Sequence, residues 1–97
     1  MRFEYAARFP RSVRRIPFHD QRRAAEAIEQ IIGYYETRQA PEGLGLKKLF
    51  SKEGLGAVFE ARVSLSSRLL FTAKQEVVTF LMVGDHDEVR RFIRSFR

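Results

Sequence analysis

Two arginines, Arg62 and Arg68, flank a serine-rich turn at residues 64–66. A three-residue loop at this turn would place Phe59 opposite Phe71, so that apolar side chains meet across the hairpin. The same register places Arg62 directly across from Arg68, and like charges that face each other invite an anion such as a phosphate group. A two-residue loop would put the arginines on opposite faces. Two solvated arginines without a ligand are the other alternative.

His86 is the residue whose side chain suits acid–base chemistry. It follows the apolar segment 76–83, and residues at the end of a buried strand can converge on a ligand without disturbing the core. Imidazole titrates near neutral pH, where acid–base cleavage of RNA requires it. A histidine in a polar turn is also often a plain surface residue. The predicted catalytic set is therefore His86 with Arg68 and Arg62.

Further basic residues are candidates for contacts with an anionic substrate. They are Lys47, Lys48, Lys52, Arg90 and Arg91. Lys47 and Lys48 alternate with leucines in a predicted strand, and Lys52 lies in the predicted turn at 51–54 that follows. These lysines either contact phosphate or protect an exposed sheet edge from pairing with other chains.

The composition favours nucleic acid as a partner. The chain of 97 residues carries a net charge of +6, and arginine, which meets phosphate bidentately and stacks on bases, supplies most of the positive charge. A solvated basic surface without a specific partner remains the alternative. An N-terminal group of arginines is predicted to be a landing surface for RNA or for an acidic protein segment: Arg8, Arg11, Arg14, Arg15, Arg22 and Arg23.

Other classes of protein are disfavoured by what the sequence lacks. Cysteine is absent, which excludes disulfides, thiolate catalysis and cysteine-bound zinc, and two separate histidines predict no metal site and no cofactor. No apolar run is long enough to span a bilayer, and the N-terminal segment lacks the apolar stretch of a signal peptide. We expect one cytoplasmic domain over residues 1–97.

The elements that must position these side chains follow from periodicity. A helical period covers 19–38, with Asp20 as its predicted cap and His19 as an end residue. The other predicted elements are a strand at 2–8, a short basic helix or turn at 9–17, strands at 44–50, 55–65, 67–73 and 76–83, and a C-terminal helix in 85–97 whose outer face carries arginines including Arg97.

This order predicts an α+β fold. Four consecutive strands suggest a small twisted, mainly antiparallel sheet with an N-terminal helical hairpin packed on one face and a short C-terminal helix. The segment 76–83 is apolar on both faces, which predicts the central strand. We expect all the helices on the same face of the sheet.

The second half of the chain resembles the RelE/ParE toxin superfamily, specifically the RelE-type mRNA interferases of toxin–antitoxin pairs. The resemblance rests on the strand Leu46-Lys47-Lys48-Leu49, Arg62 in the next strand, Arg68-Leu69-Leu70-Phe71, and the closing Gly84-x-His86-Asp-Glu-Val-x-Arg91. About fifty residues are covered with specific matches, whereas the first half fits in helix length and period only.

The resemblance implies a RelE-like ribonuclease that works without a metal or cofactor, cleaves mRNA on the ribosome and is neutralised by a cognate antitoxin with an acidic or amphipathic segment. In such enzymes an RNA 2′-hydroxyl attacks the adjacent phosphate. Carried over by position, Arg62 and Arg68 would hold that phosphate, Lys47 or Lys48 would add positive charge, and His86 would act as acid or base.

One position departs from the family pattern. Many relatives have a tyrosine where this chain has Arg90. Either His86 carries the proton chemistry without it, Phe92 supplies the stacking on a base, or the enzyme is slow or altered in activity.

Two alternatives to an RNA-cleaving toxin stay open. One is a ParE-like toxin that inhibits gyrase without ribonuclease activity, since the same fold serves both classes, and the other is a non-catalytic basic RNA-binding or interaction module.

Overall fold

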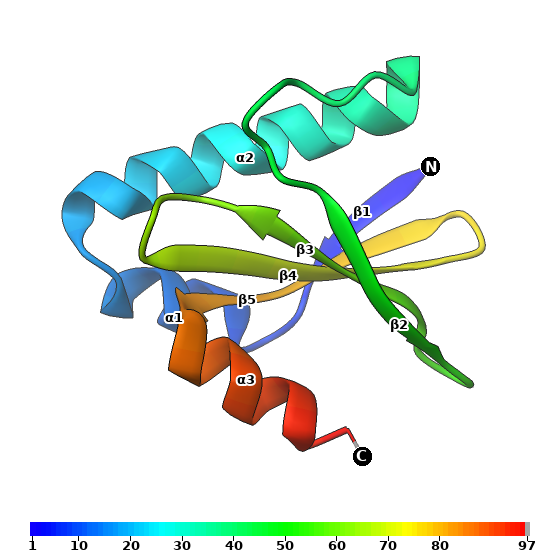
Figure 1. Cartoon of the computed structure of the whole chain (residues 1–97). Coiled ribbons are helices and arrows are strands. Elements are labelled where there is room, and N and C mark those ends of the chain that lie inside the picture. The colour runs from blue at the N-terminus through cyan, green and yellow to red at the C-terminus, as the bar shows by residue number, and fades with distance from the viewer. Residues whose placement is uncertain (97) are drawn as a thin grey trace.

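The computed structural model describes residues 1–96 of the chain, and Arg97, expected on the outer face of the last helix, lies outside them. Three helices and a five-stranded sheet alternate in an α+β arrangement (Figure 1), which confirms the predicted fold class. The elements are β1 (Arg2–Tyr5), α1 (Phe9–Arg15), α2 (Phe18–Thr37), β2 (Lys47–Lys52), β3 (Gly56–Arg62), β4 (Ser67–Lys74), β5 (Val77–Asp85) and α3 (His86–Arg94). Within the described residues, no helix is long and apolar enough to cross a membrane.

The sheet has the strand order β1-β5-β4-β3-β2. Strands β2 to β5 pair in antiparallel fashion, as predicted, but β1 adds to β5 in parallel, with Arg2 opposite Val77. The apolar strand β5 lies inside the sheet between β1 and β4. The middle position nevertheless belongs to β4, so the prediction that 76–83 is the central strand was wrong. Without β1, strand β5 would lie at the edge of the sheet, so its apolar faces reflect an interior position next to β1 and not a central one.

Side chains on the two faces of the sheet enter two separate cores. Phe71 and Phe80 pack with Ile31 of α2 and with residues of α1, whereas Leu70 and Met82 pack with Val89 of α3. Adjacent strand residues point to opposite faces, so α3 covers the face opposite α2, as Figure 1 shows. The expectation that all helices share one face was therefore wrong, because β5 is apolar on both sides and each side needs a cover.

The long helix begins and ends within one residue of its predicted bounds, but its first turn differs from the prediction. Pro17 is the N-cap residue, and no side chain caps the helix. Asp20 lies inside the first turn, where it is 5% exposed. It therefore does not act as the predicted cap, and its carboxylate contacts the β3–β4 loop instead.

Strand β2 starts three residues later than the predicted strand at 44–50 and includes part of the predicted turn. Gly43 and Gly45 have φ angles of 91° and 60°, which are not extended conformations. Leu44 between them is buried, and its carbonyl accepts a hydrogen bond of 2.7 Å from the Arg62 amide. The segment before β2 thus seals the core as a loop. Strand β1 also ends at Tyr5 rather than at residue 8, because α1 begins at Phe9.

Candidate functional site

The β3–β4 hairpin has the predicted three-residue register. Phe59 lies opposite Phe71, with ring centroids 5.2 Å apart, and Arg62 lies opposite Arg68. The amide of Val63 donates to the carbonyl of Ser67 over 3.1 Å, which closes the loop. Arg62 and Arg68 therefore start from the same face of the sheet, the face that α3 covers.

The two guanidinium groups nevertheless occupy different surroundings. Arg68 is half-buried, and its Nη1 donates to the carbonyl oxygens of Ser64 and Ser67 at 2.7 and 3.1 Å. Arg62 is exposed and lies against Gly45, where an added Cβ would be 3.8 Å from the Arg62 Cζ. It lines a depression of about 420 Å³ beside α2, together with Arg22 and Arg23 among other residues. Backbone register alone does not bring the arginine pair onto one anion.

Arg68 instead shares an open hollow with His86. We call this the Arg68–His86 hollow, and it measures about 500 Å³. It lies between the β3–β4 loop and the start of α3, and its lining residues are Leu65, Ser66, Arg68, Asp85, His86 and Asp87. Two of the three predicted catalytic side chains therefore meet here.

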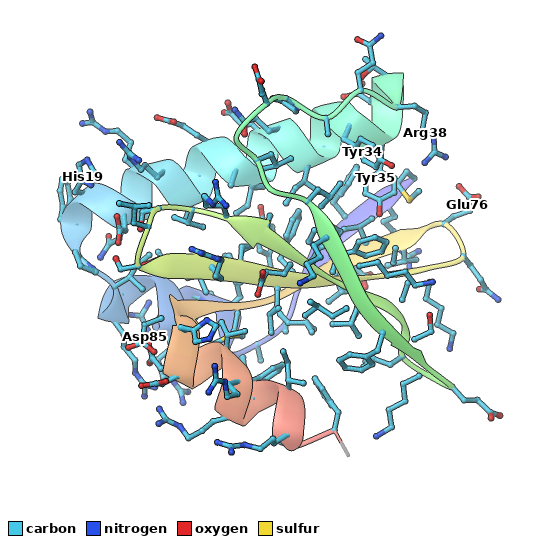
Figure 2. All side chains as sticks on the ribbon, in the orientation of Figure 1. His19, Tyr34, Tyr35, Arg38, Glu76 and Asp85 are labelled. Carbon is cyan, nitrogen blue, oxygen red and sulfur yellow. The ribbon has the colours of Figure 1, made fainter. Side chains whose placement is uncertain are left out.

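The start of α3 fixes the position of His86. Asp85, labelled in Figure 2 where β5 passes into the helix, is the N-cap residue. Its Oδ1 accepts from the Glu88 amide at 2.8 Å, and Glu88 Oε1 accepts from the Asp85 amide at 2.9 Å. This reciprocal capping box sets the direction in which the chain enters the helix. His86 is the first helical residue and is exposed on the hollow.

Arg90 lies one helical turn after His86 and contacts its ring. Its Nη2 is 2.5 Å from Nε2 of His86. A guanidinium group can only donate, so Nε2 of His86 is the acceptor in this contact. Arg90, at the position where many of the toxins that the sequence resembles have a tyrosine, thus contacts the predicted acid–base group.

Asp20 fixes the other wall of the hollow. Its Oδ2 accepts a hydrogen bond of 2.9 Å from Ser67 Oγ, which is buried, and one of 3.4 Å from Ser66 Oγ. Burial alone would raise the pKa of the Asp20 carboxyl. Hydrogen bonds from the serine hydroxyls of the loop, mainly Ser67, outweigh this effect, and His19 at the start of α2 (Figure 2) adds to them. The pKa of Asp20 is therefore lowered. The charged carboxylate therefore ties α2 to the loop that carries Arg68.

The predicted substrate-binding lysines are dispersed. Lys47 is paired with Glu60 and thus faces the same side of the sheet as Arg68, whereas Lys48 is paired with Phe59 and faces the opposite side. The Nζ of Lys52 lies 6.0 Å from the Phe96 ring centroid, near the end of α3. A bulge after Lys48 shifts the register of β2. Of the three lysines, Lys48 faces away from the hollow and Lys52 lies near the far end of α3. Lys47 is therefore the one that can add charge on the face of the hollow.

Arg91 points to a different surface from Arg90. Together with three arginines at α1 it lines two adjoining depressions of about 200 and 300 Å³, which we call the α1–α3 groove. The arginines of this groove are Arg8, Arg11, Arg15 and Arg91. None of them forms an ion pair with a carboxylate among residues 1–96. Arg8 lies 4.6 Å above the ring of Phe92, which holds α1 against α3.

Three residues of this region have roles that the sequence prediction missed. Asp20 is the anchor of the loop, Asp85 caps α3, and Leu65 stands in the wall of the hollow. A leucine inside a run of serines was a visible signal, because an apolar residue in a polar turn has no obvious place in the core. Among the described residues, no group of three or more His, Asp or Glu side chains is arranged to hold a metal ion.

The fold is that of RelE-type toxins. A chain of the RelB–RelE antitoxin–toxin complex from Methanococcus jannaschii matches with a TM-score of 0.67 at 16% identity, over 92% of this chain and 96% of that chain. A chain of the DinJ–YafQ complex from E. coli matches with a TM-score of 0.64 at 19% identity, over 92% and 98%. The archaeal RelE–RelB complex from Pyrococcus horikoshii OT3 gives 0.63 at 19% identity, over 87% and 92%. No protein-family model and no curated protein sequence matches the chain.

Proposed function

We propose that this protein is the toxin of a toxin–antitoxin pair and an endoribonuclease that cleaves mRNA without a metal ion or other cofactor. One observation carries the proposal: Arg68 and His86 line the same open hollow on a RelE-type fold. A cation held beside a titratable side chain is what cleavage of a phosphodiester by its own 2′-hydroxyl requires. In this proposal residues 1–97 act as one toxin domain in the cytoplasm. The protein cuts mRNA at the ribosome, and translation stops because its message is cut.

Arg68 is the proposed phosphate ligand. Both hydrogens of its Nη1 are directed at backbone carbonyls, which fixes the plane of the guanidinium group. The remaining donors, on Nε and Nη2, form one edge that can meet two phosphate oxygens. A guanidinium oriented before the substrate arrives needs no rearrangement as charge develops on the pentacoordinate phosphorus. Arg62 on β3 and Lys47 on β2 add positive potential on the β3 side of Arg68.

His86 is the proposed acid–base group. The 2′-oxygen attacks phosphorus as its proton leaves, the bond from phosphorus to the 5′-oxygen breaks, and that oxygen takes up a proton. The products are a 2′,3′-cyclic phosphate and a 5′-hydroxyl end. The Nε2 of His86 already accepts a hydrogen bond, so it has the lone pair that a base needs once Arg90 moves to a phosphate.

The proposed protein partner is an antitoxin with an acidic segment. The names of the structural neighbours include the antitoxins RelB and DinJ. The α1–α3 groove presents four arginines and one carboxylate, Glu88, which accepts a hydrogen bond in the capping box and pairs with none of them among residues 1–96. An acidic segment would supply the counter-charges that these arginines lack. The groove lies on the Arg91 side of α3, away from His86. Lys48, Lys52 and Arg91 then serve attraction to RNA or protein rather than the chemical step.

The chemistry of the cut ends tests the proposal. Purified protein is added to ribosomes programmed with a defined mRNA, and the ends are mapped. We expect 2′,3′-cyclic phosphate and 5′-hydroxyl ends, and no cut where the scissile nucleotide is replaced by its 2′-deoxy form. Ends with a 5′-phosphate would mean attack by water and would overturn the mechanism. Absence of cutting together with inhibition of gyrase supercoiling would favour the ParE-like alternative, and RNA binding without either activity would favour a non-catalytic module.

A further inference from the structure

Leu65 is a large apolar side chain left almost wholly in solvent beside the proposed catalytic groups. It is 95% exposed at the tip of the β3–β4 loop, and it lines the Arg68–His86 hollow. Burial of a leucine stabilises a protein by roughly the free energy of transfer of its carbons from water. At this position the fold gains none of that free energy, so Leu65 has no role in the core.

The loop nevertheless holds Leu65 in a fixed place. The hydroxyl of Ser64 accepts from the amides of Ser66 and Ser67 at 3.2 and 3.1 Å. Arg68 bonds the Ser64 carbonyl from one side, and Asp20 bonds the Ser66 and Ser67 hydroxyls from the other. These bonds run to the residues on both sides of Leu65. An apolar side chain on a rigid backbone loses little conformational freedom when it contacts a ligand.

We infer that Leu65 is a substrate-contacting residue that packs against an unpaired nucleobase next to the scissile phosphate and thereby sets base preference. The inference rests on the function proposed above. With the phosphate on Arg68, the attached nucleoside must extend along the walls of the hollow, and Leu65 is the apolar wall. The other side chains that line the hollow, namely Ser66, Arg68, Asp85, His86 and Asp87, are polar or charged. A base offers a flat, weakly hydrated face that an aliphatic side chain can cover.

The first test compares cleavage by Leu65→Ala with cleavage by the unsubstituted protein on ribosomes carrying one mRNA. We expect the rate to fall about tenfold, since roughly half of the leucine surface would be covered by a base, and the preference for the base beside each cut to weaken. Phe18→Ala is the matched control, because Phe18 is 79% exposed and is not among the residues that line the hollow. Both variants should melt at the temperature of the unsubstituted protein.

The second test asks whether the contact is with a base. Short single-stranded RNAs with a 2′-deoxy scissile nucleotide are compared with versions in which one base at a time is removed. For the unsubstituted protein, one abasic position should weaken binding about tenfold, whereas for Leu65→Ala the same position should have no effect.

Three results would overturn the inference. The first is a cleavage rate and a cut-site distribution that are unchanged in Leu65→Ala. The second is an equal loss of affinity for abasic RNA in both proteins. The third is a Leu65→Ala variant that loses antitoxin binding but keeps its RNA cleavage and RNA affinity. If the unsubstituted protein cuts and Leu65→Ala cuts equally well, the proposed function stands and only the role of Leu65 fails. If the unsubstituted protein does not cut at all, both fail together.

Discussion

The buried carboxylate of Asp20 provides a quantitative test of how the site is held. Replacement by alanine removes the acceptor of the Ser67 hydroxyl. Ser67 is 2% exposed, so solvent does not readily replace the lost hydrogen bond. A hydrogen bond to a charged group contributes about 1.5–3 kcal/mol, and the weaker bond from Ser66 adds a smaller amount. We expect Asp20→Ala to lower the free energy of unfolding by about 2–4 kcal/mol. For a domain of this size that corresponds to a fall in Tm of roughly 10–20 °C.

Asp20→Asn separates the charge from the shape. The amide keeps one acceptor oxygen for Ser67 but lacks the negative charge, so at pH 7 we expect a loss of about 1–2 kcal/mol. The pKa of Asp20 in the folded protein lies below its ordinary value of 3.8. The charged carboxylate therefore stabilises the folded state above pH 3.8. This contribution disappears as the pH falls through the pKa of the folded protein. The two proteins should therefore converge in stability in strong acid.

Urea unfolding at pH 7 and at pH values below 4 measures both effects. Ser67→Ala and the double variant Asp20→Ala/Ser67→Ala complete a cycle, in which the double loss should be smaller than the sum of the single losses. Our explanation would be refuted if Asp20→Asn were as stable as the unsubstituted protein at pH 7. A stability difference that stays constant into strong acid would also refute it, because a protonated carboxyl and an amide are then equivalent.

Three further predictions concern the proposed chemistry and partner. His86→Gln should lower the rate of cleavage by at least a hundredfold and leave RNA affinity within a factor of two, and equal losses in both would make His86 a positioning residue. Arg68→Ala should reduce the slope of log binding constant against log salt by about 0.7, the value for one contact to single-stranded RNA, and an unchanged slope would remove Arg68 as a phosphate ligand. Arg15→Glu should weaken binding of the cognate antitoxin at least tenfold while cleavage of RNA continues, and loss of cleavage alone would assign the α1–α3 groove to RNA.

The sequence alone predicted the β3–β4 hairpin because its local features all favoured the same strand register. Apolar pairing of Phe59 with Phe71 and a serine-rich turn selected one register, which the structure confirms. The helical period likewise located α2 to within one residue. In both cases neighbours in sequence carry the information, so patterning alone identifies the element.

Contacts between distant segments were the part that patterning could not supply. The parallel docking of β1 on β5 and the cover of the second sheet face by α3 depend on which surfaces remain free after the hairpins form. Asp20 looked like a helix cap because a carboxylate near a helix start usually is one, and its partner Ser67 lies far along the chain. The side chain of Arg62 turns towards Gly45 rather than Arg68 because the loop before β2 lies beside it, and register fixes only the backbone.

The parallel pairing of β1 with β5 has a consequence for biosynthesis. Strand β1 leaves the ribosome before the other strands, yet Val77, the ladder partner of Arg2, emerges only after β2, β3 and β4 have been made. Pairing of β1 with β5 closes a long loop and is therefore slow. Strand β1 stays unpaired while β2, β3 and β4, which are joined by short local turns, pair with one another. His86 follows β5 directly, so the step that completes the sheet also delivers the proposed catalytic group. Under the proposed function, a nascent chain therefore acquires its catalytic group only when its sheet is complete.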